Sequence, residues 1–328
     1  MTSDRVFGFQ IAPIASLLGG TQSALNPQGP AASEIAALTW LLFAGAAAIF
    51  LGVVAFAAYA LFARRGRRAW MARTEFVVAA GIVFPLVVLT GLLIRAFLPT
   101  AEGDSGPASA LLRIEVVGEQ WWWRVHYLNA GGGHEFATAN EIRIPVGRPV
   151  ELSLRSADVI HSFWVPNLAG KLDMIPGRVN RLHLSAEQAG EFRGQCAEYC
   201  GGPHARMAFF VIAQRPDEFE AWRAQQQRPA TVPATQSTER GQWLFVERGC
   251  GVCHSVRGTA AQSTRGPDLT HVGSRISLGA GTLRNRAGAL ADWISSSQHL
   301  KPENLMPSFD TLPAAELGAI AAYLESLQ

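Results

Sequence analysis

Two long apolar runs near the N-terminus dominate the hydrophobic pattern of the chain. The first extends from Ile35 to Phe62 and the second from Phe76 to Ile94, and neither contains a charged residue. Because about 20 apolar residues cross a bilayer, the pattern predicts two transmembrane helices, over residues 35–62 and 76–98. Five of the arginines lie in the short segment between the runs. Such a loop faces the cytoplasm, so both ends of the helical pair are expected outside.

A shorter apolar run, Val6 to Leu18, precedes the two helices and follows a single Arg5. This order is typical of the apolar region of a secretory signal, although the charged region is weak. We therefore predict a leader segment within residues 1–30.

The pattern changes after Pro99 to short alternating segments. Leu111–Val117, Val150–Leu154 and Val179–Leu184 alternate apolar and polar residues and are separated by Gly, Pro and Asn. Several short strands with such turns predict an antiparallel β-sandwich or barrel rather than parallel units with crossover helices. This domain is expected over residues 101–224 and ends in a short helix that starts near Pro216.

The last third of the chain has a helical pattern. Residues 225–238 contain two prolines and no apolar period, which predicts a linker. Residues 239–328 are expected to form a small all-α domain, whose last helix is indicated by Leu317, Ile320 and Leu324.

Composition agrees with membrane attachment. Charged residues make up 16% of the chain and hydrophobic residues 48%, with a mean hydropathy of +0.13, whereas a typical soluble chain is about 25% charged. The apolar content excludes a disordered chain, and four cysteines in 328 residues exclude a disulfide scaffold.

Charge is unevenly distributed but forms no basic domain. Residues 1–100 hold 7 Lys/Arg against 3 Asp/Glu, residues 101–228 hold 13 against 15, and residues 229–328 hold 8 against 8. Since no basic stripe covers a folded domain, nucleic-acid binding is disfavoured.

A group of soft metal ligands stands near the end of the β domain. Cys196, Cys200, His204 and Met207 fall within twelve residues on a Gly- and Pro-rich loop. Thiolates with imidazole favour copper, and methionine is a weak copper ligand, whereas zinc would gain little from it. A Cys196–Cys200 disulfide is the alternative, but it leaves the histidine and the methionine unexplained.

Such a site needs a further strong donor from elsewhere in the chain. His161, at the end of a strand-like stretch, is the candidate. His126, His134 and His183 have no companion ligands in the sequence, and we interpret them as ordinary strand histidines.

The C-terminal domain carries a haem attachment motif. Cys250, Cys253 and His254 form the Cys-x-x-Cys-His pattern, in which both thiols bond the haem and the histidine ligates the iron. A thioredoxin-like redox pair is the alternative, but it would require a strand–helix–strand context. Met306 is the only methionine after the motif and is therefore the candidate sixth ligand, with His271 and His299 as the alternatives.

Residues from about 35 to 222 resemble subunit II of the haem–copper terminal oxidases. The resemblance rests on the two helices, the Trp-rich strand at Trp121, the segment from Asp158 to His161, and the ligand loop. It implies a cupredoxin-like sandwich with a dinuclear copper centre, CuA. In that family the ligands would be the bridging sulfurs of Cys196 and Cys200, the imidazoles of His161 and His204, and, as weak ligands, Met207 and the carbonyl of Glu198.

The resemblance implies further roles. Trp121 matches the aromatic position through which electrons reach CuA, with strand packing as the alternative role. Asp173 and Glu198 match residues near a magnesium site shared with subunit I. Glu75 is the candidate proton-channel residue, although its spacing to Pro85 is longer than the family's pattern.

The C-terminal domain resembles a class I cytochrome c. Pro267 matches the residue whose carbonyl accepts a hydrogen bond from the haem-ligating histidine, and Gly241, Phe245 and Tyr323 match the packed pair of terminal helices.

Together, the two domains resemble the fused subunit of caa-type cytochrome c oxidases. This implies an electron-input subunit of a proton-translocating oxidase in the bacterial inner membrane, with both redox domains on the periplasmic face. Its partners would be subunit I, other oxidase subunits and a cytochrome c donor. The CuA subunit of a nitric oxide reductase and a stand-alone membrane-anchored electron carrier are the alternatives.

Overall fold

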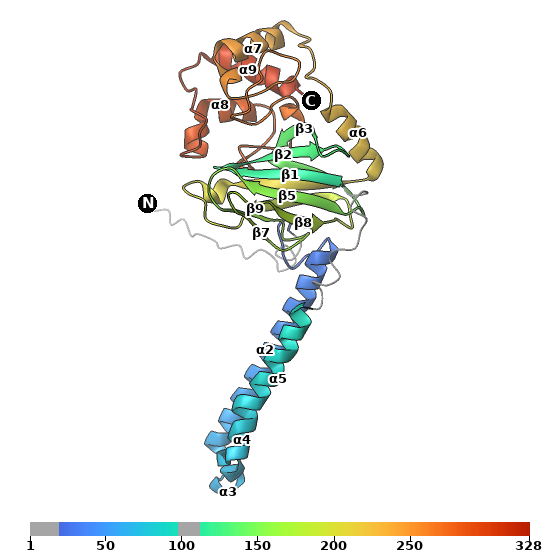
Figure 1. The fold of residues 1–328 in the computed structure, drawn as a ribbon. Helices are drawn as coiled ribbons and strands as arrows, with labels where there is room; N and C mark the ends of the chain where they lie inside the picture. The colour runs from blue at the N-terminus through green and yellow to red at the C-terminus, as the bar shows by residue number, and fades with distance from the viewer. Residues whose placement is uncertain (1–19, 98–111) are drawn as a thin grey trace, which may run out of the picture. The chain divides into compact units, whose positions relative to one another are not determined.

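The computed structural model describes residues 20–97 and 112–328 of the chain (Figure 1). They belong to two compact units, one of residues 33–107 and the other of residues 1–32 together with 108–328. The apolar run from Val6 to Leu18, and Leu111 at the start of the first predicted strand, lie outside the described residues.

The smaller unit consists mainly of two long helices. Helix α2 spans Pro30–Phe62, and the second helix is continuous over Thr74–Phe97. The second is built from α4 (Thr74–Val78), a π-helical turn η2 (Ala79–Val83) and α5 (Phe84–Phe97). Both are long and apolar enough to cross a membrane, as the sequence predicts.

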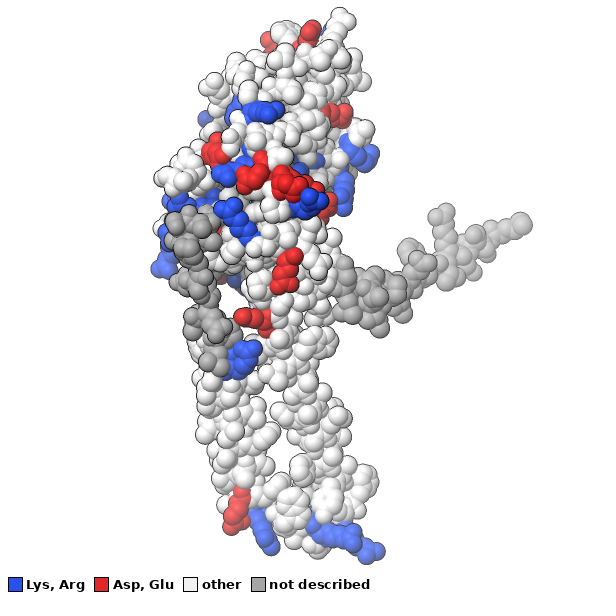
Figure 2. Space-filling view, turned by 90° about the vertical axis from the view of Figure 1, so that its right-hand side faces the viewer, with Lys and Arg blue, Asp and Glu red and all other residues white. Residues whose placement is uncertain are grey.

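The arginine-rich segment forms the turn between these helices. It contains α3 (Arg65–Arg68) and the short η1 (Ala69–Ala72). The Tyr59 hydroxyl donates a hydrogen bond to the Arg67 carbonyl at 2.9 Å, and the Trp70 ring packs edge-on against Phe76 at 4.6 Å between centroids. Basic side chains therefore gather at one end of the helical pair (Figure 2).

The larger unit begins with a β-sandwich of two five-stranded sheets. The first sheet has the order β3-β2-β1-β5-β8, and the second has the order β4-β10-β9-β6-β7. In chain order the strands are β1 (Leu112–Glu119), β2 (Trp122–Leu128), β3 (His134–Ala139), β4 (Glu141–Pro145), β5 (Val150–Ser156), β6 (His161–Trp164), β7 (Leu172–Met174), β8 (Asn180–Leu184), β9 (Gly190–Cys196) and β10 (Ala208–Gln214).

The predicted sandwich is confirmed, but it is not wholly antiparallel. Strand β1 pairs in parallel with β5, and β10 pairs in parallel with β4. Both pairs join strands that are distant in sequence, which local alternation cannot reveal. In β1 and β2 every second side chain is buried, so alternate residues of these strands face the core.

Aromatic rings fill the core between the sheets. Trp123 from β2 packs against Phe163 and Phe209 of the opposite sheet, at 5.9 and 4.9 Å between ring centroids. Helix α6 (Pro216–Gln226) begins at the predicted proline and closes one end of the sandwich by packing Trp222 on Tyr127, at 5.3 Å.

The segment before the first helix is also part of this unit. The Gln28 amide donates to the Asn167 carbonyl at 2.7 Å, and the Arg193 amide donates to the Thr21 carbonyl at 2.8 Å. The predicted leader within residues 1–30 overlaps this segment. Thr21 and Gln28 belong to the larger unit.

The C-terminal domain is helical, as predicted. Its main helices are α7 (Gln236–Glu247), α8 (Ala289–Leu300) and α9 (Ala314–Ser326), and its short elements are η5 (Cys250–Val252), η6 (Val272–Ser274), β11 (Ser277–Leu278) and β12 (Leu283–Arg284). Helices α7 and α9 cross at Gly241, where any Cβ would overlap the carbonyl oxygen of Ala319. Phe245 and Tyr323 pack beside this crossing, at 6.0 Å between ring centroids.

Residues 227–235 connect α6 to α7 without regular structure, whereas both ends of the predicted linker over residues 225–238 lie in these helices. They nevertheless lie on the C-terminal domain. The Ala230 amide donates to the Arg257 carbonyl at 2.9 Å, and the Thr231 hydroxyl donates to the Ser326 carbonyl at 3.2 Å. The linker is therefore packed against the domain that it precedes.

Candidate metal and haem sites

The ligand loop connects β9 to β10, two interior strands of the second sheet, at one end of these strands. Cys196 is the last residue of β9, and Met207 immediately precedes β10. The Cys196 amide donates to the Met207 carbonyl at 2.9 Å and so closes the base of the loop. Residues between them turn through the 3-10 helix η4 (His204–Arg206), which brings His204 back towards the cysteines.

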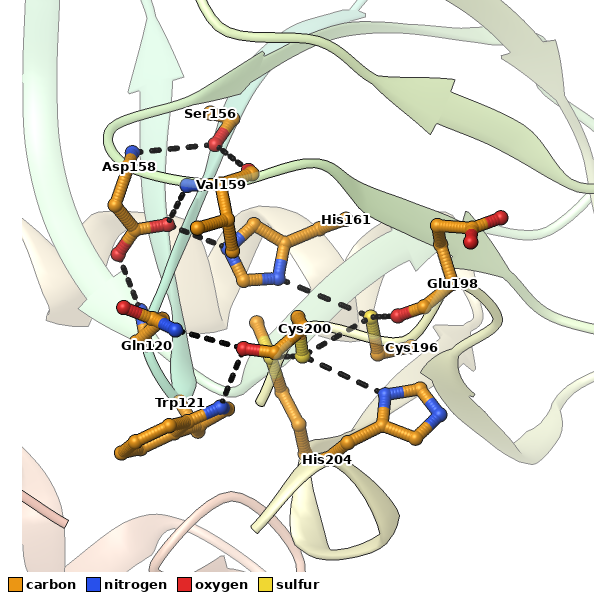
Figure 3. A network of polar contacts seen from close by, with 11 residues as sticks. Gln120, Trp121, Ser156, Asp158, Val159, His161, Cys196, Glu198, Cys200 and His204 are labelled. Carbon is orange, nitrogen blue, oxygen red and sulfur yellow. Dashed lines mark hydrogen bonds and ion pairs between the residues drawn. The ribbon is translucent and has the colours of Figure 1, made fainter. Parts of the chain in front are cut away.

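The predicted soft donors converge (Figure 3). The Sγ atoms of Cys196 and Cys200 are 3.8 Å apart, and both thiols are free and buried, so the disulfide alternative is not adopted. The Nδ1 atom of His161 lies 3.8 Å from Cys196 Sγ, and that of His204 lies 3.4 Å from Cys200 Sγ. One imidazole therefore flanks each sulfur.

Two weaker donors complete the group. Met207 Sδ lies 3.8 Å from Cys200 Sγ, and the Glu198 carbonyl oxygen lies 3.1 Å from Cys196 Sγ. The carboxylate of Glu198 points away from the sulfurs (Figure 3). Two thiols, two imidazoles, a thioether and a carbonyl around one centre form a donor set that suits copper.

The two thiols ionise unequally. Contact with the Cys200 thiol, followed by the hydrogen bond with His161, lowers the pKa of Cys196. The same contact, together with burial, raises the pKa of Cys200. The first thiol of the pair therefore loses its proton easily. The second thiol is deprotonated only when a metal cation binds in place of the proton.

His161 is held by partners on its other ring nitrogen. Its Nε2 lies 2.8 Å from Asp158 Oδ1, and Asp158 Oδ2 accepts from the Gln120 amide at 2.7 Å. Burial lowers the pKa of His161, but its hydrogen bonds with Cys196 and Asp158 raise it on balance. A carboxylate on one nitrogen fixes the ring so that Nδ1 faces the sulfurs.

Space for this ring comes from Gly118. A Cβ at that position would lie 2.8 Å from His161 Cδ2. Gly118 makes space for the His161 ring, and Asp158 orients it. Both roles depend on strand pairing, so they could not be predicted from the sequence.

Trp121 lies directly against the ligand loop. Its indole Nε1 donates to the Cys200 carbonyl at 2.9 Å, and the Gln120 side chain donates to the same oxygen at 2.7 Å. The ring is half-buried. Trp121 is thus joined by one hydrogen bond to the backbone of a cysteine of the site.

The predicted magnesium residues do not come together with other ligands. Asp173, on β7, forms an ion pair with Lys171 at 3.3 Å. Within residues 20–97 and 112–328, neither Asp173 nor Glu198 belongs to a cluster of three potential metal ligands. The chain by itself does not support a magnesium site.

The haem motif lies directly after helix α7. Cys250 begins η5 and is half-buried, while Cys253 is exposed. His254 Nδ1 lies 2.8 Å from the Pro267 carbonyl, as the resemblance implies. Burial lowers the pKa of His254, so the ring is neutral and its Nε2 is available to a metal.

Met306 lies on a loop held by hydrogen bonds from α8. Its amide donates to Asn304 Oδ1 at 2.9 Å, and its carbonyl accepts from Gln298 Nε2 at 2.6 Å. His271, one of the alternative iron ligands, has its ring nitrogens directed at the carbonyls of Gln328 and Arg228, at 2.7 and 3.2 Å. Both ring nitrogens of His271 are therefore engaged by backbone carbonyls.

The β-sandwich and the C-terminal domain each match a known protein family. Residues 112–214 match the family "Cytochrome C oxidase subunit II, periplasmic domain", and residues 238–328 match the family "Cytochrome c". The chain is 37% identical over 251 residues to cytochrome c oxidase subunit 2 of Alkalihalophilus pseudofirmus, which covers 75% of this chain and 71% of that protein. It is 30% identical over 274 residues to the Bacillus subtilis protein of the same name, covering 77% of this chain and 75% of that one.

Among solved structures, the chain is similar to the periplasmic domain of subunit II of cytochrome oxidase from Bradyrhizobium japonicum. The sequence identity is 32%, and the match covers 37% of this chain and 96% of that domain, with a TM-score of 0.34.

Proposed function

Because the chain belongs to the cytochrome c oxidase subunit II family, we propose that it is the electron-input subunit of a proton-translocating terminal oxidase. Its two matched domains imply a CuA copper centre and a haem c. In this proposal, electrons from a cytochrome c donor pass to the haem, then to CuA, and then to the separate subunit that reduces oxygen.

The proposed copper ligands are the six convergent donors described above. Cys196, Cys200, His161 and His204 would hold the copper ions as the strong ligands. Met207 and the Glu198 carbonyl would be the weak ligands. The centre, when loaded, supplies one-electron transfer, and the protein keeps its ligands fixed through the Asp158 contact and the closed base of the loop.

The proposed haem attachment uses the thiols of Cys250 and Cys253, with His254 and Met306 as axial ligands. The Pro267 carbonyl orients His254, and Gln298 holds the loop of Met306. A thioether ligand favours a high potential, which suits a donor to copper.

The proposed electron route from the haem to the copper centre is supported by a hydrogen bond between the two domains. Lys301, which follows α8 and precedes the Met306 loop, donates from Nζ to the Trp121 carbonyl at 2.6 Å. Trp121 in turn donates to the Cys200 carbonyl. The segment that precedes the loop of the proposed haem ligand is thereby connected through Trp121 to the backbone of a proposed copper ligand, which supports Trp121 as the residue through which electrons reach CuA.

Further contacts hold the cytochrome domain on the sandwich. The Ala208 amide donates to the Ala280 carbonyl at 3.0 Å, and the Ile276 amide donates to Glu141 Oε2 at 2.9 Å. Residues 227–235 pack on the cytochrome domain, and hydrogen bonds cross its boundary with the sandwich. These contacts support a pair of centres that is held together before electron transfer.

The two apolar helices suit anchoring in a membrane, and the matched family domain is periplasmic. We propose the bacterial inner membrane as the location, with the arginine turn in the cytoplasm and both redox domains in the periplasm. Oxidase subunit I would then bind beside the helices.

The experiment is truncation within the assembled oxidase. Removing residues 227–328 deletes the cytochrome domain and leaves the helices and the sandwich. The truncated complex is expected to retain the CuA spectrum while oxygen consumption with the physiological donor falls severely, and soluble cytochrome c at high concentration should partly restore it. Wild-type turnover by the truncated complex would contradict the route. Reduction of nitric oxide, or purification without any haem–copper subunit, would contradict the oxidase function.

A further inference from the structure

A second group of metal-ligating side chains lies on the outer face of the first sheet, away from the copper loop. It comprises Glu115 on β1, His126 on β2 and His134 at the start of β3. From the sequence, both histidines are interpreted as ordinary strand residues because they have no companion ligands nearby in the chain, where 19 and 8 positions separate His134 from Glu115 and His126. Pairing of the three strands brings these residues close together in space.

The pairing register explains why the three side chains meet. Glu115 lies directly opposite His126 in the antiparallel β1–β2 pair, so both side chains project from the same face. Strand β3 pairs with β2 and places the His134 ring on that of His126, at 4.0 Å between centroids and 10° between planes. Ligand atoms of all three side chains lie within 4.8 Å of one another.

We propose that Glu115, His126 and His134 bind one divalent transition-metal ion of the zinc class. Two imidazoles and a carboxylate are a ligand set that zinc uses, with water in the fourth position. Zinc–nitrogen bonds are about 2.0–2.1 Å long and lie in the plane of the imidazole, so the His134 ring must tilt away from its parallel arrangement with His126 for both rings to reach one ion. The half-exposed His134 at the end of its strand is free to make that adjustment.

The polar contacts of the group are compatible with an ion. His134 Nε2 lies 3.0 Å from Glu115 Oε2, so a metal ion can replace the hydrogen bond between these two atoms. Arg155 holds the other carboxylate oxygen, Oε1, at 3.2 Å, which leaves Oε2 directed at the histidines.

Both positively and negatively charged side chains lie near this group. Arg124 and Arg155 are the neighbouring cations, while Asp268 of the cytochrome domain adds a negative charge that acts on His126. Arg124 is itself occupied, since it donates to Glu119 and to the Thr264 carbonyl at 2.6 Å. The ion would therefore join three strands of the sheet next to the cytochrome domain.

The test is titration of the full-length chain, in detergent and loaded with copper and haem, with Zn²⁺ alone. Copper loading occupies the cysteines, so isothermal titration calorimetry reports other sites. We expect one zinc ion per chain and a higher unfolding temperature at saturating zinc. Glu115→Gln and His134→Gln should each weaken zinc binding by more than the about 10- to 100-fold typical of residues that only orient a ligand.

The matched control is His183→Gln. His183 also pairs with a glutamate across the same sheet, Glu151 at 3.4 Å, but it lies in no cluster of three ligands among the described residues. This variant should bind zinc as the wild type does. The CuA and haem spectra verify that each variant is folded, and His126→Asn replaces either variant that is not. Absence of zinc binding to the wild type, or equal binding by the wild type and the cluster variants, overturns the proposal.

Discussion

The side-chain nitrogen of Lys301 lies 2.6 Å from the backbone carbonyl oxygen of Trp121, although one residue belongs to the cytochrome domain and the other to the sandwich. The same nitrogen also donates to the Gly279 carbonyl at 3.1 Å. Lys301 is only 2% exposed. Since burial of an amine is unfavourable unless it is hydrogen-bonded, these two carbonyls fix the position of the lysine at the domain boundary.

Lys301→Met should loosen this boundary. The substitution keeps an unbranched side chain, one atom shorter, but leaves the Trp121 carbonyl without its donor, which costs about 1–3 kcal/mol for a buried group. We expect normal copper and haem content but slower electron transfer from haem to CuA, measured by flash photolysis of the full-length protein. Lys171→Met, which alters an exposed lysine on the same sandwich, should leave the rate unchanged. Equal rates in wild type and Lys301→Met would remove Lys301 from the docking contact.

The same residue predicts a dependence of docking on pH. Burial lowers the pKa of Lys301 to about 7, whereas a free lysine has a pKa of about 10.4. At a pH between these two pKa values, Lys301 is protonated when the cytochrome domain is undocked and deprotonated when it is docked. Docking should therefore strengthen as the pH rises from about 7 to 10 and be independent of this group below that range. The haem-to-CuA rate should rise with pH in the wild type, and this part of the pH profile should be absent in Lys301→Met.

Local sequence signals account for much of the fold and the sites. The haem motif from Cys250 to His254 and the ligand loop from Cys196 to Met207 each place their ligands within a short segment, so spacing alone predicts the chemistry. The transmembrane helices follow from length, because few soluble elements have such uncharged runs.

Long-range features could not be predicted in this way. The contact of Lys301 with Trp121 joins residues 180 positions apart, and the His126–His134 cluster depends on strand register. The parallel pairing of β1 with β5 has the same origin. Each of these features depends on how distant segments pack, which hydrophobic alternation and residue spacing do not encode.

The copper site should require both cysteines. In Cys200→Ser one bridging sulfur is lost, and a hydroxyl is a harder and weaker ligand for copper. We expect a mononuclear or empty site in place of two copper ions, measured by copper analysis and electron paramagnetic resonance of the full-length protein. Tyr199→Phe, a change of an exposed neighbour, is the control and should retain both ions. One copper per wild-type chain would contradict the dinuclear site.

The crossing of α7 and α9 should not tolerate a side chain at position 241. In Gly241→Ala the new methyl group would overlap the Ala319 carbonyl, and such overpacking costs about 1–3 kcal/mol. Gly318→Ala, on the open face of α9, should instead be neutral or stabilising by up to about 1 kcal/mol. Denaturant unfolding followed by haem absorption compares the two variants. Equal free energies of unfolding would show that the helices do not cross as closely as described.

Replacement of Met306 should change the haem potential without releasing the haem. The covalent bonds depend on Cys250 and Cys253, so Met306→His should retain the haem on a denaturing gel stained for covalent haem. Imidazole is a harder donor than a thioether and stabilises the ferric state more, and axial ligands set haem potentials over a range of about 0.8 V. Redox titration should therefore give a lower midpoint potential. Leu305→Gln changes the exposed neighbouring residue and should leave the potential unchanged. An unchanged potential in Met306→His would mean that another residue, such as His299, ligates the iron.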